Sequence, residues 1–139
     1  MRLEESADAA RLTPFVLQLW SRGWPDTRGE ADARDHVRTL LRAGHRAWLA
    51  QDGGETVGYA MVRDNGDHLC LRHFVIDAGR RRQGLGRRFA GLLAERHGRP
   101  AMRLDVMMTD DRARAFWEAL GFAPTATNMR RAETESLGC

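Results

Sequence analysis

The chain has 139 residues, of which 42% are hydrophobic and 29% are charged, with a formal net charge of +3. This length suits one domain with its own core, so we expect residues 1–139 to form a single domain. No apolar run approaches the roughly 20 residues of a membrane span, and the N-terminal residues lack the apolar stretch of a signal peptide. The two cysteines, Cys70 and Cys139, do not have the number or spacing of a disulfide framework or a metal site. These features favour a cytoplasmic protein without a metal, in a reducing compartment.

The first part of the chain predicts an edge strand followed by two helices. Residues 1–5 are long enough for a short strand. Residues 13–23 predict a helix with Thr13 as its N-cap and Pro14 at its first position. Residues 29–44 predict a second helix, because their apolar residues recur at helical spacing.

The middle of the chain predicts an antiparallel meander of strands. Strand-like runs cover residues 46–51 and 56–63, and the sequence DGGE between them is typical of a hairpin turn. A second turn sequence, DNGD, precedes a third run at residues 68–77. Consecutive strands with such short connections are expected to pair as neighbours.

The last part of the chain alternates helices and strands. We expect a helix over residues 84–98, a strand over 101–108, a helix over 110–121 with Asp110 as its N-cap, and a last strand over 127–133. The whole order, β-α-α-β-β-β-α-β-α-β, predicts an α/β mixed sandwich with a largely antiparallel sheet.

The stretch RRRQGLGRR, residues 80–88, lies between a predicted strand and a predicted helix. The first turn of a helix has free N–H groups and a partial positive charge, and Gly84 and Gly86 let phosphate oxygens approach the backbone. A Walker A loop is excluded because all 22 basic residues are arginines. A dinucleotide fingerprint does not fit, because Phe89 stands where its third glycine is required.

Residues Arg81 to Gly86 read Arg-x-x-Gly-x-Gly, and RARAFWEALGF follows at 112–122. Together these motifs resemble those of the GNAT superfamily of N-acetyltransferases, whose element order the chain shares. The resemblance implies the GNAT fold, a central and mostly antiparallel sheet with helices on both faces. It also implies acetyl-CoA as co-substrate and transfer of the acetyl group to a primary amine by direct attack on the thioester.

The resemblance further implies where the two substrates bind. The strand before the loop would hold the pantetheine arm and the thioester carbonyl, the loop would hold the pyrophosphate, and the last helix would contact the cofactor. The implied cofactor residues are Phe74, Val75, Ile76, Arg81, Arg82, Gln83, Gly84, Leu85, Gly86, Arg87, Asp110, Phe116 and Trp117. Trp24 and Arg72 are the implied acceptor residues.

The catalytic residues depart from the family pattern. Trp117 stands where the family often has a tyrosine general acid, and Arg72 and Cys70 stand where it often has a glutamate or histidine base. An indole is a poor proton donor and arginine stays protonated, so neither can fill these roles. A water chain to one of four weak candidates could carry the proton instead: Asp26, His36, His73 or Asp105.

Position 72 also bears on the acceptor. A fixed positive charge directed at the acceptor suits a substrate that carries a carboxylate, which arginine binds through two parallel hydrogen bonds. An ion pair between Arg72 and Asp105, or another acid on a neighbouring strand, is the alternative.

Three functions remain open from the sequence. The first is an acetyltransferase that acts on a small-molecule or peptide amine, with no nucleic acid or membrane partner and a homodimer as a compatible assembly. The second is a non-catalytic acyl-CoA sensor, which the missing acid and base allow. The third is a nucleic-acid binder that uses residues 80–88, although this stretch lacks the interleaved aromatic residues of such proteins.

Overall fold

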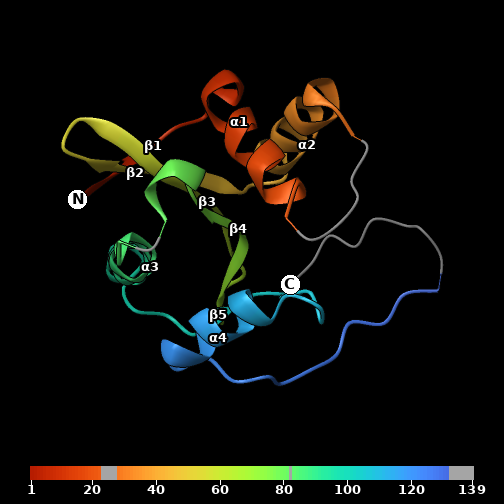
Figure 1. Cartoon of the computed structure of the whole chain (residues 1–139). Helices are drawn as coiled ribbons and strands as arrows, with labels where there is room; N and C mark the ends of the chain where they lie inside the picture. The colour runs from red at the N-terminus through yellow and green to blue at the C-terminus, as the bar shows by residue number, and fades with distance from the viewer. Residues whose placement is uncertain (23–27, 82, 132–139) are drawn as a thin grey trace.

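The computed structural model describes residues 1–22, 28–81 and 83–131. It is an α/β fold in which helices cover both faces of one sheet (Figure 1). The strands are β1 (Arg2–Glu5), β2 (Arg46–Asp52), β3 (Glu55–Asp64), β4 (Leu69–Ile76) and β5 (Met102–Arg103). The helices are α1 (Ala9–Trp20), α2 (Glu30–Arg42), the short 3-10 helix η1 (Ala78–Arg80), α3 (Leu85–Arg96) and α4 (Asp111–Ala119).

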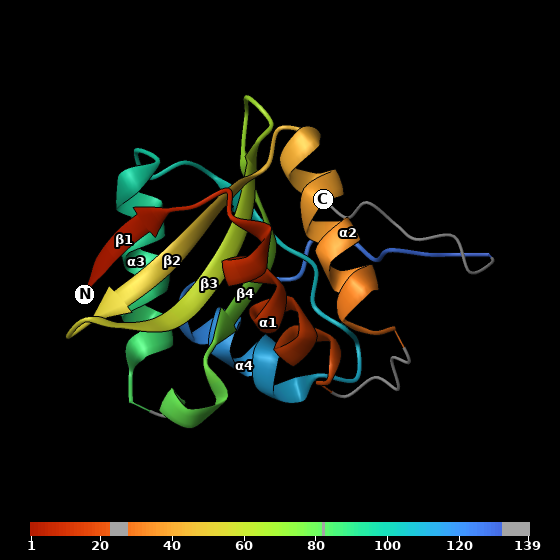
Figure 2. The ribbon, with the colours of Figure 1, turned by 90° about the horizontal axis from the view of Figure 1, so that it is seen from above.

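The strands follow one another in the sheet in chain order, β1-β2-β3-β4-β5. The first four pair antiparallel, and Figure 2 shows them side by side behind α1. Only β5 lies parallel to its neighbour, β4. The predicted α/β fold with a mostly antiparallel sheet is therefore confirmed.

Each face of the sheet has its own apolar core. Helices α1 and α2 pack on one face and α3 and α4 on the other (Figure 1). The first core contains Leu12, Phe15, Val16, Val37, Leu40, Leu49, Tyr59, Met61 and Val75. The second contains Trp48, Val57, Ala60, Val62, Leu69, Leu71, Leu85, Phe89, Leu93 and Trp117. Burial of this apolar surface on both faces is the main stabilising contribution to such a fold.

A bulge interrupts the pairing of β4 with β3. The consecutive residues Met61 and Val62 pair with His73 and Leu71, so the pairing skips Arg72. A bulge adds one residue to one strand, which redirects its side chains relative to the partner strand. The alternation of β4 is therefore different before and after Arg72.

Helix α1 begins five residues earlier than the sequence predicted. Its N-cap is Asp8, whose carboxylate accepts a hydrogen bond from the Ala10 N–H at 3.0 Å. Thr13 is buried inside the helix, and its hydroxyl donates to the Ala9 carbonyl at 2.6 Å. Pro14 lies in the helix interior with its ring exposed. Since proline has no N–H, α1 lacks one backbone hydrogen bond at this position.

Two predicted strands also differ. The strand expected over residues 101–108 is only Met102–Arg103, because the chain then diverges from β4 and has no strand to pair with. The strand expected over 127–133 is absent from its described part, residues 127–131, where every residue is exposed and offers no apolar face to the sheet. Residues 132 and 133 lie outside the described part.

Cys70 differs from its expected state. Its side chain is 1% exposed, as expected of a small core residue, but it is disulfide-bonded. The argument from reduced thiols for a cytoplasmic location therefore does not hold.

Candidate functional site

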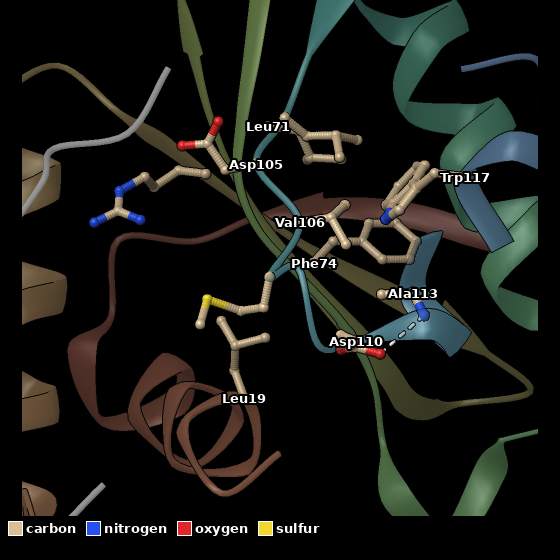
Figure 3. Close-up of a pocket in the computed structure, with 11 residues that line it drawn as sticks. Leu19, Leu71, Phe74, Asp105, Val106, Asp110, Ala113 and Trp117 are labelled. Carbon is tan, nitrogen blue, oxygen red and sulfur yellow. Dashed lines mark hydrogen bonds between the residues drawn. The ribbon is translucent and has the colours of Figure 1, made fainter. Parts of the chain in front are cut away.

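A cavity of about 130 Å³ lies where β4 and β5 separate (Figure 3). The two strands pair only at Leu69 with Met102 and at Cys70 with Arg103. Beyond these pairs the chains diverge, and side chains from both of them, from α1 and from α4 line the space between. The lining residues are Leu19, Leu71, Arg72, Phe74, Leu104, Asp105, Val106, Met107, Asp110, Ala113 and Trp117.

The cavity has an apolar side and a charged side. In Figure 3, Leu71, Phe74, Val106 and Trp117 gather together, whereas the carboxylate of Asp105 points away from them. Apolar walls exclude water and strengthen the interactions of charges nearby. Such a cavity can bind an uncharged group on one side and a polar group on the other.

Trp117 forms part of the apolar side. It is 8% exposed, and its ring lies edge-on to Phe74 at 5.0 Å, to Phe116 at 4.8 Å and to Phe122 at 5.1 Å between centroids. Edge-to-face contacts at these distances are favourable for aromatic pairs. Trp117 is therefore a packing residue that also forms a wall of the cavity.

Asp110 caps α4 as predicted. Its carboxylate accepts a hydrogen bond from the Ala113 N–H at 2.9 Å, drawn as a dashed line in Figure 3. A carboxylate at this position satisfies one of the free N–H groups of the first helical turn. The side chain of Asp110 thus lines the cavity and stabilises the start of α4.

The start of α3 is an anion-binding arrangement. Gly84 is its N-cap with a φ of 72°, a left-handed conformation that glycine adopts without strain. The first helical hydrogen bond runs from the Arg88 N–H to the Gly84 carbonyl, so the three preceding N–H groups have no acceptor within the helix. The first turn contains no acidic residue. These features fit the donor set that a pyrophosphate group requires.

The arginines of residues 80–88 have different roles. Arg80 pairs with Glu55, and its other guanidinium nitrogen lies 3.9 Å from Asp52. Arg81 is exposed, and its Nε donates to the Ile76 carbonyl at 3.2 Å. Arg80 is thus held by acids of the β2–β3 hairpin, which leaves Arg81 as the nearer candidate for a phosphate. Arg82 lies outside the described residues.

A second cation lies near Arg81. Partial burial and the positive charge of Arg22 lower the pKa of Arg81, while Asp77 opposes this shift. The positive charges of Arg22 and Arg81 therefore act on each other, and an anion bound near them would reduce this repulsion. Arg87 is exposed in the first turn of α3, where it adds to the same positive field.

Gly86 brings α4 close to the loop. A Cβ atom at this position would lie 3.2 Å from two atoms of the Phe116 ring and 3.6 Å from the Ile76 side chain. The Phe116 ring in turn stacks on Phe74 with centroids 6.0 Å apart. The loop and the cavity are therefore connected through one aromatic contact.

The remaining predicted cofactor residues offer mainly backbone groups. The side chains of Val75 and Leu85 are 1% and 4% exposed in the cores, so only their amides and carbonyls can reach a ligand. Gln83 is exposed in the loop. The backbone role that the family resemblance assigns to this strand and loop stays a prediction.

Gln18 is a residue that sequence reasoning missed. Its amide nitrogen donates to the Asp77 carboxylate at 2.9 Å, and its carbonyl accepts from the Ala78 N–H at 3.0 Å. Both bonds tie α1 to the start of the loop, 59 and 60 residues away in sequence. The one available signal is that Gln18 is a polar residue among the apolar residues of a helix, where it is half-buried. This signal does not identify its partners.

Two of the four catalytic candidates, His36 and His73, lie in a chain of rings that is only partly buried at His36. The His73 imidazole is 3% exposed; its Nδ1 lies 3.0 Å from the Tyr59 hydroxyl and its Nε2 lies 3.3 Å from Nε2 of His36. Burial raises the pKa of Tyr59, and burial together with the positive charge of Arg72 lowers the pKa of His73. Tyr59 therefore stays protonated and donates to His73, which remains neutral.

The four candidates are thus separated by the fold. Asp105 lines the cavity, whereas His36 and His73 are not among its described lining residues. Asp26 lies outside the described residues, as does the acceptor candidate Trp24. Arg72, the other acceptor candidate, lines the cavity together with Asp105, and no ion pair joins these two described side chains.

Comparisons with known proteins bear on the family and on the fold. A family model described as "Acetyltransferase (GNAT) family" matches residues 13–122. A protein of Clostridium difficile 630 described as a possible acetyltransferase has a TM-score of 0.78 at 17% identity, with 97% of this chain and 98% of that chain covered.

Two further solved structures are similar. A ribosomal-protein-alanine N-acetyltransferase from Brucella melitensis biovar Abortus 2308 has a TM-score of 0.71 at 16% identity over 95% of this chain and 99% of that one. An aminoglycoside N-acetyltransferase, AAC(6')-Iy in complex with CoA, has a TM-score of 0.70 at 16% identity over 95% and 92%. These low identities support the fold alone. No curated protein sequence is similar enough to count as a match.

In the described part of the chain, no helix is both long and apolar enough to span a membrane. The family match covers most of the chain, and the fold and the motifs of the loop agree with it. The chain belongs to the GNAT family of acetyltransferases.

Proposed function

We propose that the chain is an acetyl-CoA-dependent N-acetyltransferase that acetylates a primary amine of a small molecule or a peptide. The start of α3 carries this proposal: its first turn, behind Gly84, has N–H groups without an acceptor in the helix, and it follows β4, the strand that lines the cavity. The Phe116 ring, which contacts both Gly86 and Phe74, connects the two places. A ligand with a pyrophosphate at one end and a small uncharged group at the other matches this layout.

The residues present fit acetyl-CoA. The N–H groups of the first turn of α3 would hold the pyrophosphate, with Arg81 and Arg87 adding charge. The part of β4 that extends past its two pairs with β5 has an open edge, whose amides would hold the pantetheine arm. Acetyl-CoA supplies a thioester carbonyl that an amine can attack directly.

The protein's contribution to the reaction is then mainly positioning. Trp117 and Phe74 shield the apolar side of the cavity from water. Asp105 is the catalytic candidate that lines the cavity, so we propose that it accepts the proton that the amine loses, directly or through a water molecule. Holding two reactants in the correct orientation can by itself supply much of the rate enhancement.

The test is acetyl-CoA affinity in a matched pair of glycine variants. Gly84 and Gly66 both have a positive φ, 72° and 89°, and a Cβ would meet nothing within 4 Å at either position. Valine therefore costs similar strain at both, about 1–2 kcal/mol. By calorimetry we expect Gly84→Val to lose acetyl-CoA binding and Gly66→Val to keep it. Unchanged affinity in a folded Gly84→Val protein would contradict the proposal.

Turnover distinguishes a transferase from an acyl-CoA sensor. If the wild-type protein releases the thiol of CoA only when an amine is present, it is a transferase. If it binds acetyl-CoA but releases no thiol with any amine tested, it is a sensor. The proposal also includes a cytoplasmic location, because its co-substrate is an intracellular metabolite, and it is compatible with a homodimer. We propose no nucleic-acid partner, since Arg80 of the basic stretch is already paired with acids.

A further inference from the structure

We propose that the open edge of β1, together with a groove between β1 and α3, is the surface at which a second copy of this chain binds. In this assembly the two β1 strands pair antiparallel across a two-fold axis, so that the two sheets join into one. The surface lies at the opposite edge of the sheet from β5, so each copy keeps its own cavity accessible. The backbone of β1, the order of its charges and the groove beside it all support this assembly.

β1 has an edge at which its backbone can pair with another strand. In the described part of the chain it pairs on one side only, with β2, and Figure 2 shows it as the outermost strand. The Ser6 N–H donates to the carbonyl of its opposite residue, Ala47, at 3.1 Å. In an antiparallel pair such residues alternate with residues whose N–H and C=O groups point the other way. The backbone groups of Leu3 and Glu5 therefore point toward the open edge.

The charges of β1 favour one register of this pairing. When a two-fold axis joins two sheets edge to edge, opposite residues lie on the same face, so both of their numbers are odd or both are even. With Leu3 opposite Leu3, Arg2 lies opposite Glu4 of the second copy, and Glu4 lies opposite its Arg2. A shift of two residues instead brings Arg2 opposite Arg2 or Glu4 opposite Glu4. Like charges directly opposite each other are destabilising, so the register centred on Leu3 is preferred.

The same register also satisfies the backbone groups at the open edge. Leu3 and its symmetry mate can exchange N–H to C=O hydrogen bonds in both directions, because both residues point their backbone outward. The Glu5 N–H meets the Met1 carbonyl of the second copy, and the symmetric bond forms on the other side of the axis. Charge order and hydrogen-bond direction thus select the same register independently.

A groove beside β1 provides apolar surface for the same contact. It has a volume of about 360 Å³ and is lined by Met1, Arg2, Leu3, Leu92, Glu95 and Arg96. Met1, Leu3 and Leu92 are half-buried, so part of their apolar surface meets water in a single copy. A two-fold axis beside Leu3 brings the two grooves together. Burial of these side chains against their symmetry mates would favour association.

Helix α3 has opposite charges on the two sides of Leu92. Arg88, Leu92 and Glu95 are four and three residues apart, so they lie along one side of the helix. Arg88 and Glu95 are both exposed. If α3 meets its symmetry mate antiparallel around Leu92, Arg88 lies near Glu95 of the second copy. The strand and the helix beside it are therefore self-complementary about the same axis.

The experiment measures the mass of the purified 139-residue protein in solution by sedimentation equilibrium over a range of concentrations. We expect a reversible equilibrium between monomer and dimer, with the dimer predominant at micromolar concentrations. This measurement needs no acetyl-CoA, so its failure and the failure of the proposed function are distinguishable.

Two charge-reversal variants test the register. Arg2→Glu and Glu4→Arg each place like charges opposite each other on both sides of the axis, so each alone should weaken dimerisation about tenfold or more. Mixed in equal amounts, the two variants place opposite charges on both sides again, so a mixed dimer should form with nearly wild-type affinity. Arg38→Glu, which reverses an exposed arginine of α2 outside the proposed surface, should dimerise like the wild type.

A proline variant tests the backbone pairing separately from the charges. Leu3→Pro removes an N–H that points to the open edge and leaves the hydrogen bonds between β1 and β2 in place, as proline on an edge strand allows. We expect this variant to be folded by circular dichroism and to have lost the dimer. It also decides if Glu4→Arg does not fold, because Glu4 pairs with Arg11 of α1 in the same chain.

Recovery in the mixture requires pairing between two copies, so a purely structural role of Arg2 or Glu4 would not produce it. A wild type that stays monomeric at every concentration overturns the proposal, and a partner bound at this edge would then be a different protein. A dimer that the folded variants do not weaken, or a mixture without recovery, overturns it as well, because the two copies then meet elsewhere.

Discussion

Trp117 is the residue at which this chain departs most clearly from the usual acid of its family. Its ring packs against Phe74, Phe116 and Phe122, and the indole N–H does not titrate in the working range. We expect Trp117→Phe to lower kcat/KM through lost packing but to leave both limbs of the pH–rate profile in place. Measurement of kcat/KM across the pH range would count against this account if one limb disappeared in the variant.

His73 makes stability depend on pH. Burial lowers its pKa in the folded protein, whereas an unfolded histidine titrates near about 6.5. Below this pH the unfolded chain binds a proton that the folded chain does not, so stability is complete above about pH 6.5 and falls as the pH decreases further. The lowered pKa values of His45 and His97 act in the same direction.

For one such histidine the slope approaches about 1.4 kcal/mol per pH unit. We therefore expect the unfolding free energy of the wild type to fall between about pH 7 and about pH 5, and His73→Gln to flatten this decrease. Urea denaturation at several pH values measures both slopes. An equal slope in the variant would show that another group is responsible.

The two glycines of the loop meet different structural requirements, and only one of these can be recognised in the local sequence. Gly84 needs its left-handed conformation, as a glycine before a helix suggests. Gly86 is required instead by the Phe116 ring, which comes from a different helix and so could not be seen in the local pattern. Arg72 and Asp105 line the same cavity although they are distant in sequence, and spacing along the chain does not encode this.

Helix α1 holds the loop through Gln18. Its two hydrogen bonds fix Asp77 and Ala78, just before the arginines of the loop. Loss of these bonds should let the loop sample conformations that do not bind acetyl-CoA. We expect Gln18→Ala to weaken acetyl-CoA binding by about three- to tenfold, in line with about 1 kcal/mol per hydrogen bond.

A matched control for Gln18→Ala is Thr56→Ala. Its hydroxyl donates to the Gln51 side chain at 3.0 Å on the β2–β3 hairpin, so a side-chain hydrogen bond is lost outside the loop. Calorimetry should find wild-type affinity in Thr56→Ala. Equal affinity in both variants would mean that Gln18 does not organise the loop.

Pro14 is a local weakness of α1. It lies in the helix interior, where it has no N–H to donate to the carbonyl four residues earlier, and its ring is exposed. Pro14→Ala should therefore raise the unfolding free energy by about 1–3 kcal/mol. Urea denaturation at constant pH measures this change, and a loss of stability would show that the ring has a packing role.

Element boundaries were predictable where the chain signals them locally. Helical periodicity located α2 and α3, the cap at Asp110 located α4, and the turn sequences located the β2–β3–β4 meander. Thr13 and Pro14 instead imitate a helix start, and the true cap at Asp8 lies five residues before Thr13. The short β5 could not be predicted from its own residues, because its end depends on where β4 and the following segment separate.

At the scale of the whole molecule, the fold follows from the hydrophobic pattern of the chain and the order of its elements. The cavity instead arises because β4 and β5 stop pairing after two residue pairs. A sheet that stayed paired between β4 and β5 would have no cavity at this position. Because the loop and the cavity lie at two ends of the same open edge, one extended ligand can occupy both. We therefore expect acetyl-CoA to extend from the first turn of α3 along β4 into the cavity.

The most direct test of this claim is a titration of the isotope-labelled protein with CoA, followed by NMR of the backbone amides. The account predicts the largest shifts at the amides of Leu85, Gly86 and Arg87, with a second group along the open edge of β4 from Phe74 to Ile76. Shifts confined to other surfaces, or no shifts at concentrations that support catalysis, would contradict it.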